Sequence, residues 1–71
     1  MTKDELYPGM KVRLTAQCLK ETGLFQLQGA EFEFKRLSWK GMTQVAVLRP
    51  LYVKNKSTEF TAAVFYLERA V

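Results

Sequence analysis

Residues 31–50, EFEFKRLSWKGMTQVAVLRP, decide the fold, because polar and apolar residues alternate along them with the period of a β-strand. The alternation changes phase once, since the inward-facing Phe32 is even-numbered whereas Leu37 and Trp39 are odd-numbered. A β-bulge near Lys35-Arg36 would restore the register and bend the strand. The stretch therefore predicts a bent strand over residues 31–39.

A hairpin follows directly. Lys40-Gly41 is predicted to form its two-residue turn, because glycine adopts the positive φ that such turns need. The second strand is predicted from Met42 to Val53. Pro50 cannot donate a hydrogen bond to a neighbouring strand, so it marks an edge, a bulge or the end of this strand.

The segment before the hairpin begins with a turn at Pro8-Gly9 and continues as residues 11–18, KVRLTAQC, which alternate again. We expect a half-buried strand here. Cys18 falls on its apolar side and is expected to be a buried thiol, not a reactive one. Residues 19–30 are interrupted by glycines and are predicted to form a long, partly structured loop or an irregular hairpin.

The segment after the hairpin starts with a polar turn at residues 55–57 and a strand from Glu59 to Tyr66, which is rich in β-branched and aromatic residues. Leu67-Glu68-Arg69 is predicted as one helical turn and Ala70-Val71 as a last short strand. Five short strands separated by turns predict an all-β fold, a small closed or partly closed barrel in a single domain of residues 1–71.

Composition excludes several classes of site. The 71 residues include no histidine and one cysteine. The chain therefore lacks the ligands of a zinc finger, the base of a Ser-His-Asp triad and an intrachain disulfide. The first residues carry acids and lack an apolar core, and the longest apolar run spans six residues, Ala62 to Leu67. We expect a cytoplasmic protein with no signal peptide, no membrane span, no cofactor and no metal.

Two short segments resemble the SH3-like barrels, a group that includes KOW, Tudor and related stand-alone bacterial or phage modules. Residues 6–14, LYPGMKVRL, match the opening that leads into the first strand of these barrels, and residues 64–71, VFYLERAV, match their closing turn. The resemblance implies a five-stranded SH3-like barrel with one short 3-10 turn near the C-terminus. It implies little about function, since this fold carries nucleic-acid binders, peptide binders and rare enzymes.

The C-terminal segment also looks similar to that of one enzyme of this structural group, the plasmid-type (type II) dihydrofolate reductase. That family carries a Val-Gln-Ile-Tyr segment before its Leu-Glu-Arg turn. Phe60 and Ala62 stand here at the glutamine and tyrosine positions, so the polar groups that would hold folate and nicotinamide are absent. We therefore expect no enzymatic activity.

Charge is distributed unevenly along the chain. The formal net charge is +4, and no acidic residue lies between Phe34 and Thr58. Trp39 and Tyr52 alternate with the cations of this interval. Phosphate neutralisation by cations and base stacking on aromatic rings would suit RNA or DNA. The predicted contact residues are Lys35, Arg36, Trp39, Lys40, Arg49, Tyr52, Lys54 and Lys56. The alternative is a solvated basic face whose tryptophan belongs to the core.

A protein-interaction module is the second hypothesis, a phage-type or regulatory adaptor or inhibitor that binds an acidic partner. Arg49, Leu51 and Tyr52 could form its contact, although residues 51–53 could equally close the barrel wall. A homodimer through an exposed edge at Pro50–Val53 is a third possibility.

Three acidic positions have plain interpretations. Glu31 and Glu33 are expected to belong to a charged outer strand face, since no third metal ligand is near them in the sequence. Glu68, with Arg69, is expected to form a local cap or salt bridge.

Overall fold

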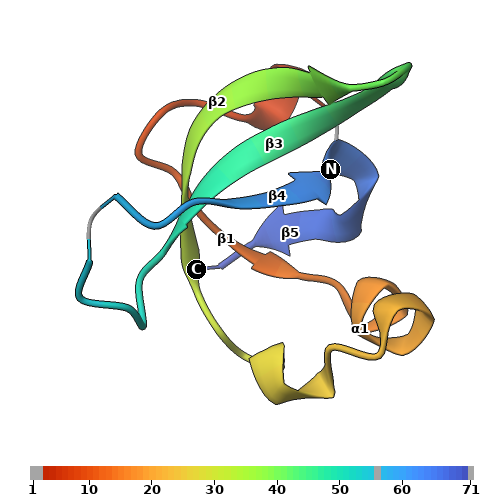
Figure 1. The fold of residues 1–71 in the computed structure, drawn as a ribbon, viewed down its shortest axis with the longest axis vertical. Coiled ribbons are helices and arrows are strands. Elements are labelled where there is room, and N and C mark those ends of the chain that lie inside the picture. Colours follow the sequence, from red (N-terminus) through yellow and green to blue (C-terminus); the bar gives the residue numbers. More distant parts are fainter. Residues whose placement is uncertain (1–2, 56, 71) are drawn as a thin grey trace.

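The computed structural model describes residues 3–55 and 57–70, and most of this part of the chain is a single antiparallel sheet of five strands (Figure 1). The strand order is β4-β3-β2-β1-β5. The strands are β1 (Lys11–Leu14), β2 (Phe32–Lys40), β3 (Thr43–Pro50), β4 (Phe60–Ala63) and β5 (Leu67–Arg69). Besides the sheet there are one helix, α1 (Ala16–Thr22), and the 3-10 turns η1 (Lys3–Glu5), η2 (Phe25–Leu27) and η3 (Val64–Tyr66).

The sheet is open. In the described residues β4 pairs only with β3, and β5 pairs only with β1, so these two strands are its edges. The prediction of five antiparallel strands is confirmed. Strand pairing does not close the sheet into a barrel, so the SH3-like barrel stays a prediction.

The long β2–β3 hairpin follows the sequence pattern closely. The register slips between Phe34 and Arg36, which confirms the predicted bulge and bends β2 over the sheet (Figure 1). Lys40 lies opposite Thr43, so the two turn residues are Gly41 and Met42, one position later than predicted. Gly41 has φ 63°, as expected where the first turn residue needs a positive φ.

The N-terminal turn also agrees with the sequence. The Met10 N–H donates to the Tyr7 carbonyl at 3.1 Å, and Gly9 at the third position of this turn has φ 89°. Proline at the second position and a positive φ at the third are the requirements of a type II turn. This turn leads directly into β1.

The strand predicted over residues 11–18 is wrong in its second half. β1 ends at Leu14, and α1 follows. The Thr15 hydroxyl accepts a hydrogen bond from the Cys18 N–H at 3.1 Å and caps the start of the helix. At its end, Gly23 has φ 75° and donates its N–H to the Leu19 carbonyl at 2.9 Å. These caps make a short helix where a strand and a loop were predicted.

The C-terminal predictions are displaced by three residues. β4 ends at Ala63, the helical turn is η3, and Leu67-Glu68-Arg69 forms strand β5 instead of a helical turn. β5 pairs with β1, with Leu67 opposite Leu14. Ala70 lies in no strand, and Val71 lies outside the described residues, as does Lys56 in the predicted polar turn.

The predicted edge at Pro50–Val53 is not an edge strand. Pro50 is the buried last residue of β3, where it lies opposite Phe32 of β2. Leu51–Val53 belong to no strand. Pro50 thus marks the end of its strand, one of the three roles that the sequence allowed.

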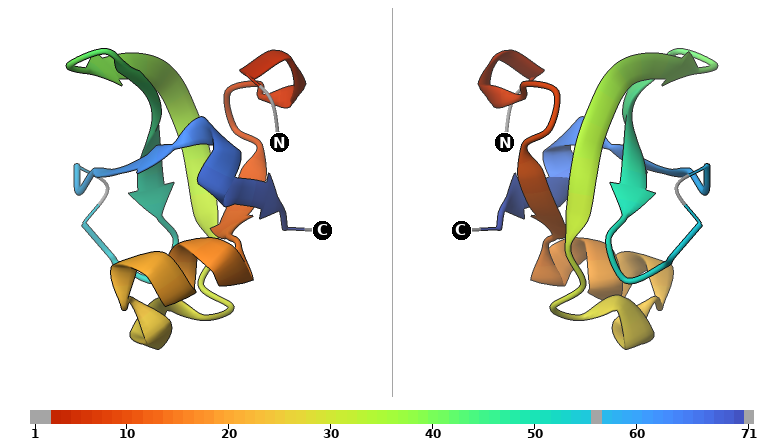
Figure 2. Two further views of the ribbon diagram at one scale, coloured as in Figure 1. Left: turned by 90° about the vertical axis from the view of Figure 1, so that its right-hand side faces the viewer. Right: turned by 90° about the vertical axis from the view of Figure 1, so that its left-hand side faces the viewer.

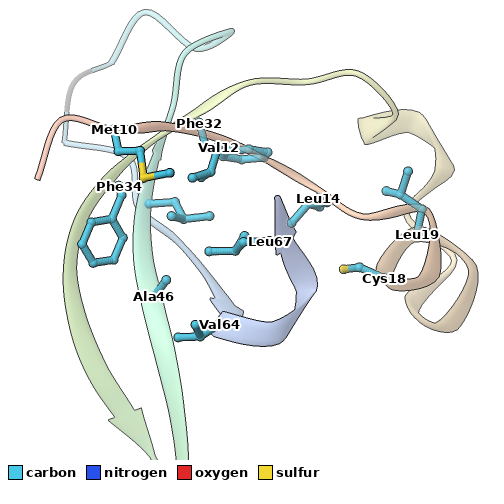
Figure 3. Close-up of a cluster of buried hydrophobic side chains, with 11 residues drawn as sticks. Met10, Val12, Leu14, Cys18, Leu19, Phe32, Phe34, Ala46, Val64 and Leu67 are labelled. Carbon is cyan, nitrogen blue, oxygen red and sulfur yellow. The ribbon is translucent and has the colours of Figure 1, made fainter. Parts of the chain in front are cut away.

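One cluster of buried side chains forms the core between the sheet and α1 (Figure 3). Phe32, Val12 and Leu67 from three different strands are fully buried at its centre. Cys18 and Leu19 project into it from α1. Cys18 is only 3% exposed, which confirms the predicted core thiol, and burial raises its pKa above the ordinary value of a cysteine.

The hairpin tip and α1 lie at opposite ends of the molecule, and β4 runs between them (Figures 1 and 2). None of the helices in residues 3–55 and 57–70 is long and apolar enough to cross a membrane.

Candidate functional site

The predicted contact residues do not form one surface. Lys35 and Arg36, at the bulge of β2, both reach Glu59, which immediately precedes β4. Lys35 Nζ lies 3.0 Å from Glu59 Oε2, and Arg36 Nη1 lies 3.1 Å from the same oxygen. The bulge explains why two consecutive side chains converge on one carboxylate. The hydrogen bond from Arg36, followed by that from Lys35, lowers the pKa of Glu59 below its usual value.

Arg49 is also paired with an acid. It lies directly opposite Glu33 across the hairpin, and its Nε is 3.0 Å from Glu33 Oε1. Glu33 therefore belongs to a charged strand face, as predicted. Of the six cations in the acid-free interval, Lys35, Arg36 and Arg49 carry a salt bridge. Folding thus brings acids from outside the interval onto the basic segment and offsets much of its charge.

Trp39 and the nearby cations lie on opposite faces of the hairpin. Leu37 is opposite the core residue Ala46, so Leu37 and Trp39 face the core side of the strand, beyond the end of the core. Arg36 and Lys40 alternate with them and face the other side. The predicted combination of a stacking ring with phosphate-binding cations on one face is therefore not formed by Trp39 and these two residues.

The hairpin tip is apolar and exposed. Trp39 is 66% exposed and Met42 is 97% exposed, with Leu37 partly exposed beside them. The core role considered for Trp39 is therefore wrong. Lys40 is exposed at the same tip and has no ion pair among the described residues. Met42 was missed by the sequence reasoning, although its place in a tight turn after Gly41 was a signal that its side chain would be solvent-exposed.

Tyr52 lies at the far end of the hairpin. Its ring packs edge-on against Phe32 with a centroid distance of 5.7 Å, while more than half of the side chain stays exposed. Most of β3, which is about 23 Å long at roughly 3.3 Å per residue, lies between Tyr52 and the partner position of Trp39. Lys54 is exposed near this end, and the predicted contact Lys56 lies outside the described residues. The two aromatic residues thus belong to separate surfaces.

A groove lies along the free edge of β4. It encloses about 210 Å³, and all four residues of the strand line it, facing Cys18 and Thr22 of α1 and Tyr66 of η3. Among the described residues that line it, Lys40 is the one that carries a charge. The sequence reasoning missed this groove because it placed the end of a strand and the start of a loop where α1 forms its wall.

Two polar side chains of the groove wall are already bonded within the chain. The Thr22 hydroxyl donates to the Cys18 carbonyl at 2.7 Å, and the Tyr66 hydroxyl donates to the Glu21 carboxylate. The bond to Glu21 raises the pKa of Tyr66 above its ordinary value, because the anionic ring would face the carboxylate.

Elsewhere on the sheet, Arg13 Nε lies 3.4 Å from Glu68 Oε1 on the neighbouring strand, so the predicted salt bridge of Glu68 forms with Arg13 and not with Arg69. In the part of the chain that the structure describes, no three acidic or cysteine side chains converge as a metal-binding group. The chain matches no protein-family model, and comparison with curated proteins and with solved structures yields no significant match.

Proposed function

We propose that the chain is a non-enzymatic protein-interaction module that binds an acidic partner through the tip of its β2–β3 hairpin. The observation that carries the proposal is the joint exposure of Trp39 and Met42 at that tip. Tryptophan is enriched among residues that dominate binding energy, and methionine adapts its shape to a partner surface. When a partner covers the tip, these apolar side chains are removed from water, and this removal favours binding.

The acidic character of the partner follows from the charges left unpaired. Among the side chains that the structure describes, five cations carry no ion pair. Of the acids, Asp4, Glu21 and Glu31 carry none, Glu5 being set aside. The unpaired cations are Lys11, Lys20, Lys40, Lys54 and Arg69. Lys40 lies at the tip itself, next to Trp39. Complementary charge of this kind accelerates encounter and excludes partners of like charge.

An SH3-like barrel is the fold that we propose for the module. Three features support it: the Pro8-Gly9 turn before the first strand, the five antiparallel strands, and the 3-10 turn η3 directly before the last strand. This fold would present the β2–β3 hairpin on a rigid core.

The test is affinity capture from the source organism with the full chain and two variants, before and after nuclease treatment, followed by calorimetry with the purified partner. Trp39→Ala is expected to weaken partner binding about 30-fold or more, as hot-spot truncations do. Phe25→Ala is the matched control, because Phe25 is an aromatic residue of similar exposure, 61%, on a different surface. Equal binding by wild type and Trp39→Ala would refute the proposed site.

Contact with single-stranded nucleic acid is a second candidate, favoured by the exposed Trp39 ring; Lys40 lies at the same tip but on the opposite face of the hairpin. Stacking on a single aromatic ring contributes about 1–3 kcal/mol per base and needs no sequence specificity. Retention that disappears after nuclease treatment, and that falls steeply with added salt, would select this candidate over an acidic protein.

A further inference from the structure

β4 is an unprotected edge strand. It pairs with β3 on one side, and no described residue forms a hydrogen bond with the backbone of its other side. Proteins protect such edges by keeping them short or with a charged side chain, a proline or a bulge. β4 is short, with four residues, but Phe60–Ala63 contain no charge, no proline and no bulge. The strand therefore offers a row of N–H and C=O groups that another strand could satisfy.

The groove described above follows this edge. Its opposite wall is formed by Cys18 and Thr22 of α1, and its volume of about 210 Å³ leaves room for a short segment of chain. The small side chains of Ala62 and Ala63 allow another backbone to approach β4 closely. Because Thr22 and Tyr66 are bonded within the chain, they do not compete for the ligand.

The polar groups left open identify the ligand. They are the backbone edge of β4 and the side chains of two exposed lining residues, Thr61 and Lys40. A backbone edge requires alternating donors and acceptors at strand spacing, which an extended peptide supplies and a nucleic acid does not. Lys40 would pair with a negative charge on the ligand, and the apolar walls of the groove would contact apolar side chains of the ligand.

We propose that an extended, acidic segment of a partner protein adds as a sixth strand along β4, with apolar side chains in the groove and a carboxylate on Lys40. The inference rests on the proposed function, since it names the partner segment that such a module would bind. Lys40 belongs to both the groove and the hairpin tip, so a partner on Trp39 could extend directly onto β4.

A second copy of this chain is a poorer occupant. Its own edge strand β4 carries no acid, and the acid of its other edge strand, Glu68, is already paired with Arg13. Glu33 lies in β2 and Glu31 directly precedes it, and β2 lies inside the sheet and has no free edge. The charge of the groove is thus complementary to a different protein.

The experiment selects binders from a random 12-residue peptide library displayed on phage against the immobilised full chain, and measures the selected peptides by fluorescence anisotropy. We expect enriched peptides with alternating apolar residues and an Asp or Glu. Lys40→Glu should weaken their binding about tenfold or more, whereas Lys54→Glu, the same charge change at an exposed lysine outside the groove, should leave it unchanged.

N-methylation of the peptide backbone tests strand addition itself. Two versions of a selected peptide are compared, one methylated at the odd-numbered backbone nitrogens and one at the even-numbered nitrogens. One version should lose binding and the other should keep it, because only alternate N–H groups face β4. Insensitivity to both phases, or failure to enrich any peptide, would overturn the inference. Peptides that lose binding with Trp39→Ala but keep it with Lys40→Glu would also overturn it, while the proposed function at the hairpin tip would stand.

Discussion

At the scale of single residues, the carboxylate of Glu59 controls the charge of the hairpin. It accepts hydrogen bonds from both Lys35 and Arg36, although more than 20 residues separate it from them in sequence. An isolated exposed salt bridge contributes little, but two cations on one carboxylate form a small network. Glu59 therefore keeps the basic pair in place and reduces its attraction for phosphate.

Loss of this network predicts a defined pH dependence. Because the folded protein lowers the pKa of Glu59, its contribution to stability is fully present above the ordinary value of 4.5 and is lost as pH falls through the lower folded pKa. The urea midpoint of Glu59→Gln should therefore lie below that of wild type at pH 7, and the two midpoints should converge in strong acid. Glu31→Gln is the control, since this exposed acid has no salt bridge in the described part of the chain. A difference that persists unchanged at low pH would contradict the assignment.

No local pattern in the sequence could have predicted the pairing of Glu59. The run between Phe34 and Thr58 contains cations and no acid, and this much was correct. Whether a surface is basic depends on which strands become neighbours, and β4 brings its preceding acid to the bulge of β2. The residue types predicted the charge of the segment, and the topology decided the charge of the surface.

At the scale of elements, helix α1 depends on its two caps. It has seven residues, which is too short to persist in water on propensity alone. Thr15→Ala removes the hydroxyl that accepts the Cys18 N–H, so we expect a loss of about 1 kcal/mol of unfolding free energy. Gln17→Ala, an exposed position within the same helix, should cost nothing or stabilise slightly. Urea denaturation of both variants makes the comparison, and equal midpoints for Thr15→Ala and wild type would exclude a capping role.

The same helix shows why alternation alone is an insufficient guide. Val12 and Leu14 face the core from a strand, and Cys18 faces it from a helix, yet all three are even-numbered and continue one apparent period of two. The available signal was the pair of caps, a threonine before the helix and a glycine after it. The bulge and the turn of the hairpin were predictable to within one residue, because the alternation on both sides of them was clear, whereas the second strand ends at Pro50 and not at the predicted Val53.

At the scale of the whole molecule, a chain of this size has little stability to lose. Proteins have about 0.05–0.15 kcal/mol per residue, so roughly 4–10 kcal/mol is expected here. Phe32 contributes a large part of this unfolding free energy, because its side chain is fully buried and its ring contacts those of Phe60 and Tyr52. These contacts join β2 to the start of β4 and to the segment after β3, so one ring connects parts of the chain that strand pairing alone leaves apart.

Phe32→Ala should therefore affect the whole fold. Truncation of a buried phenylalanine costs about 3–5 kcal/mol, which is roughly a third or more of the expected total, so we predict a large fall in the melting temperature. Phe25→Ala, which removes a ring that is 61% exposed, should change stability by less than about 0.5 kcal/mol. Thermal unfolding followed by circular dichroism compares the two. A Phe32→Ala variant that melts within a few degrees of wild type would show that the sheet and α1 hold together without this ring, and the groove along β4 would then not depend on the core beneath it.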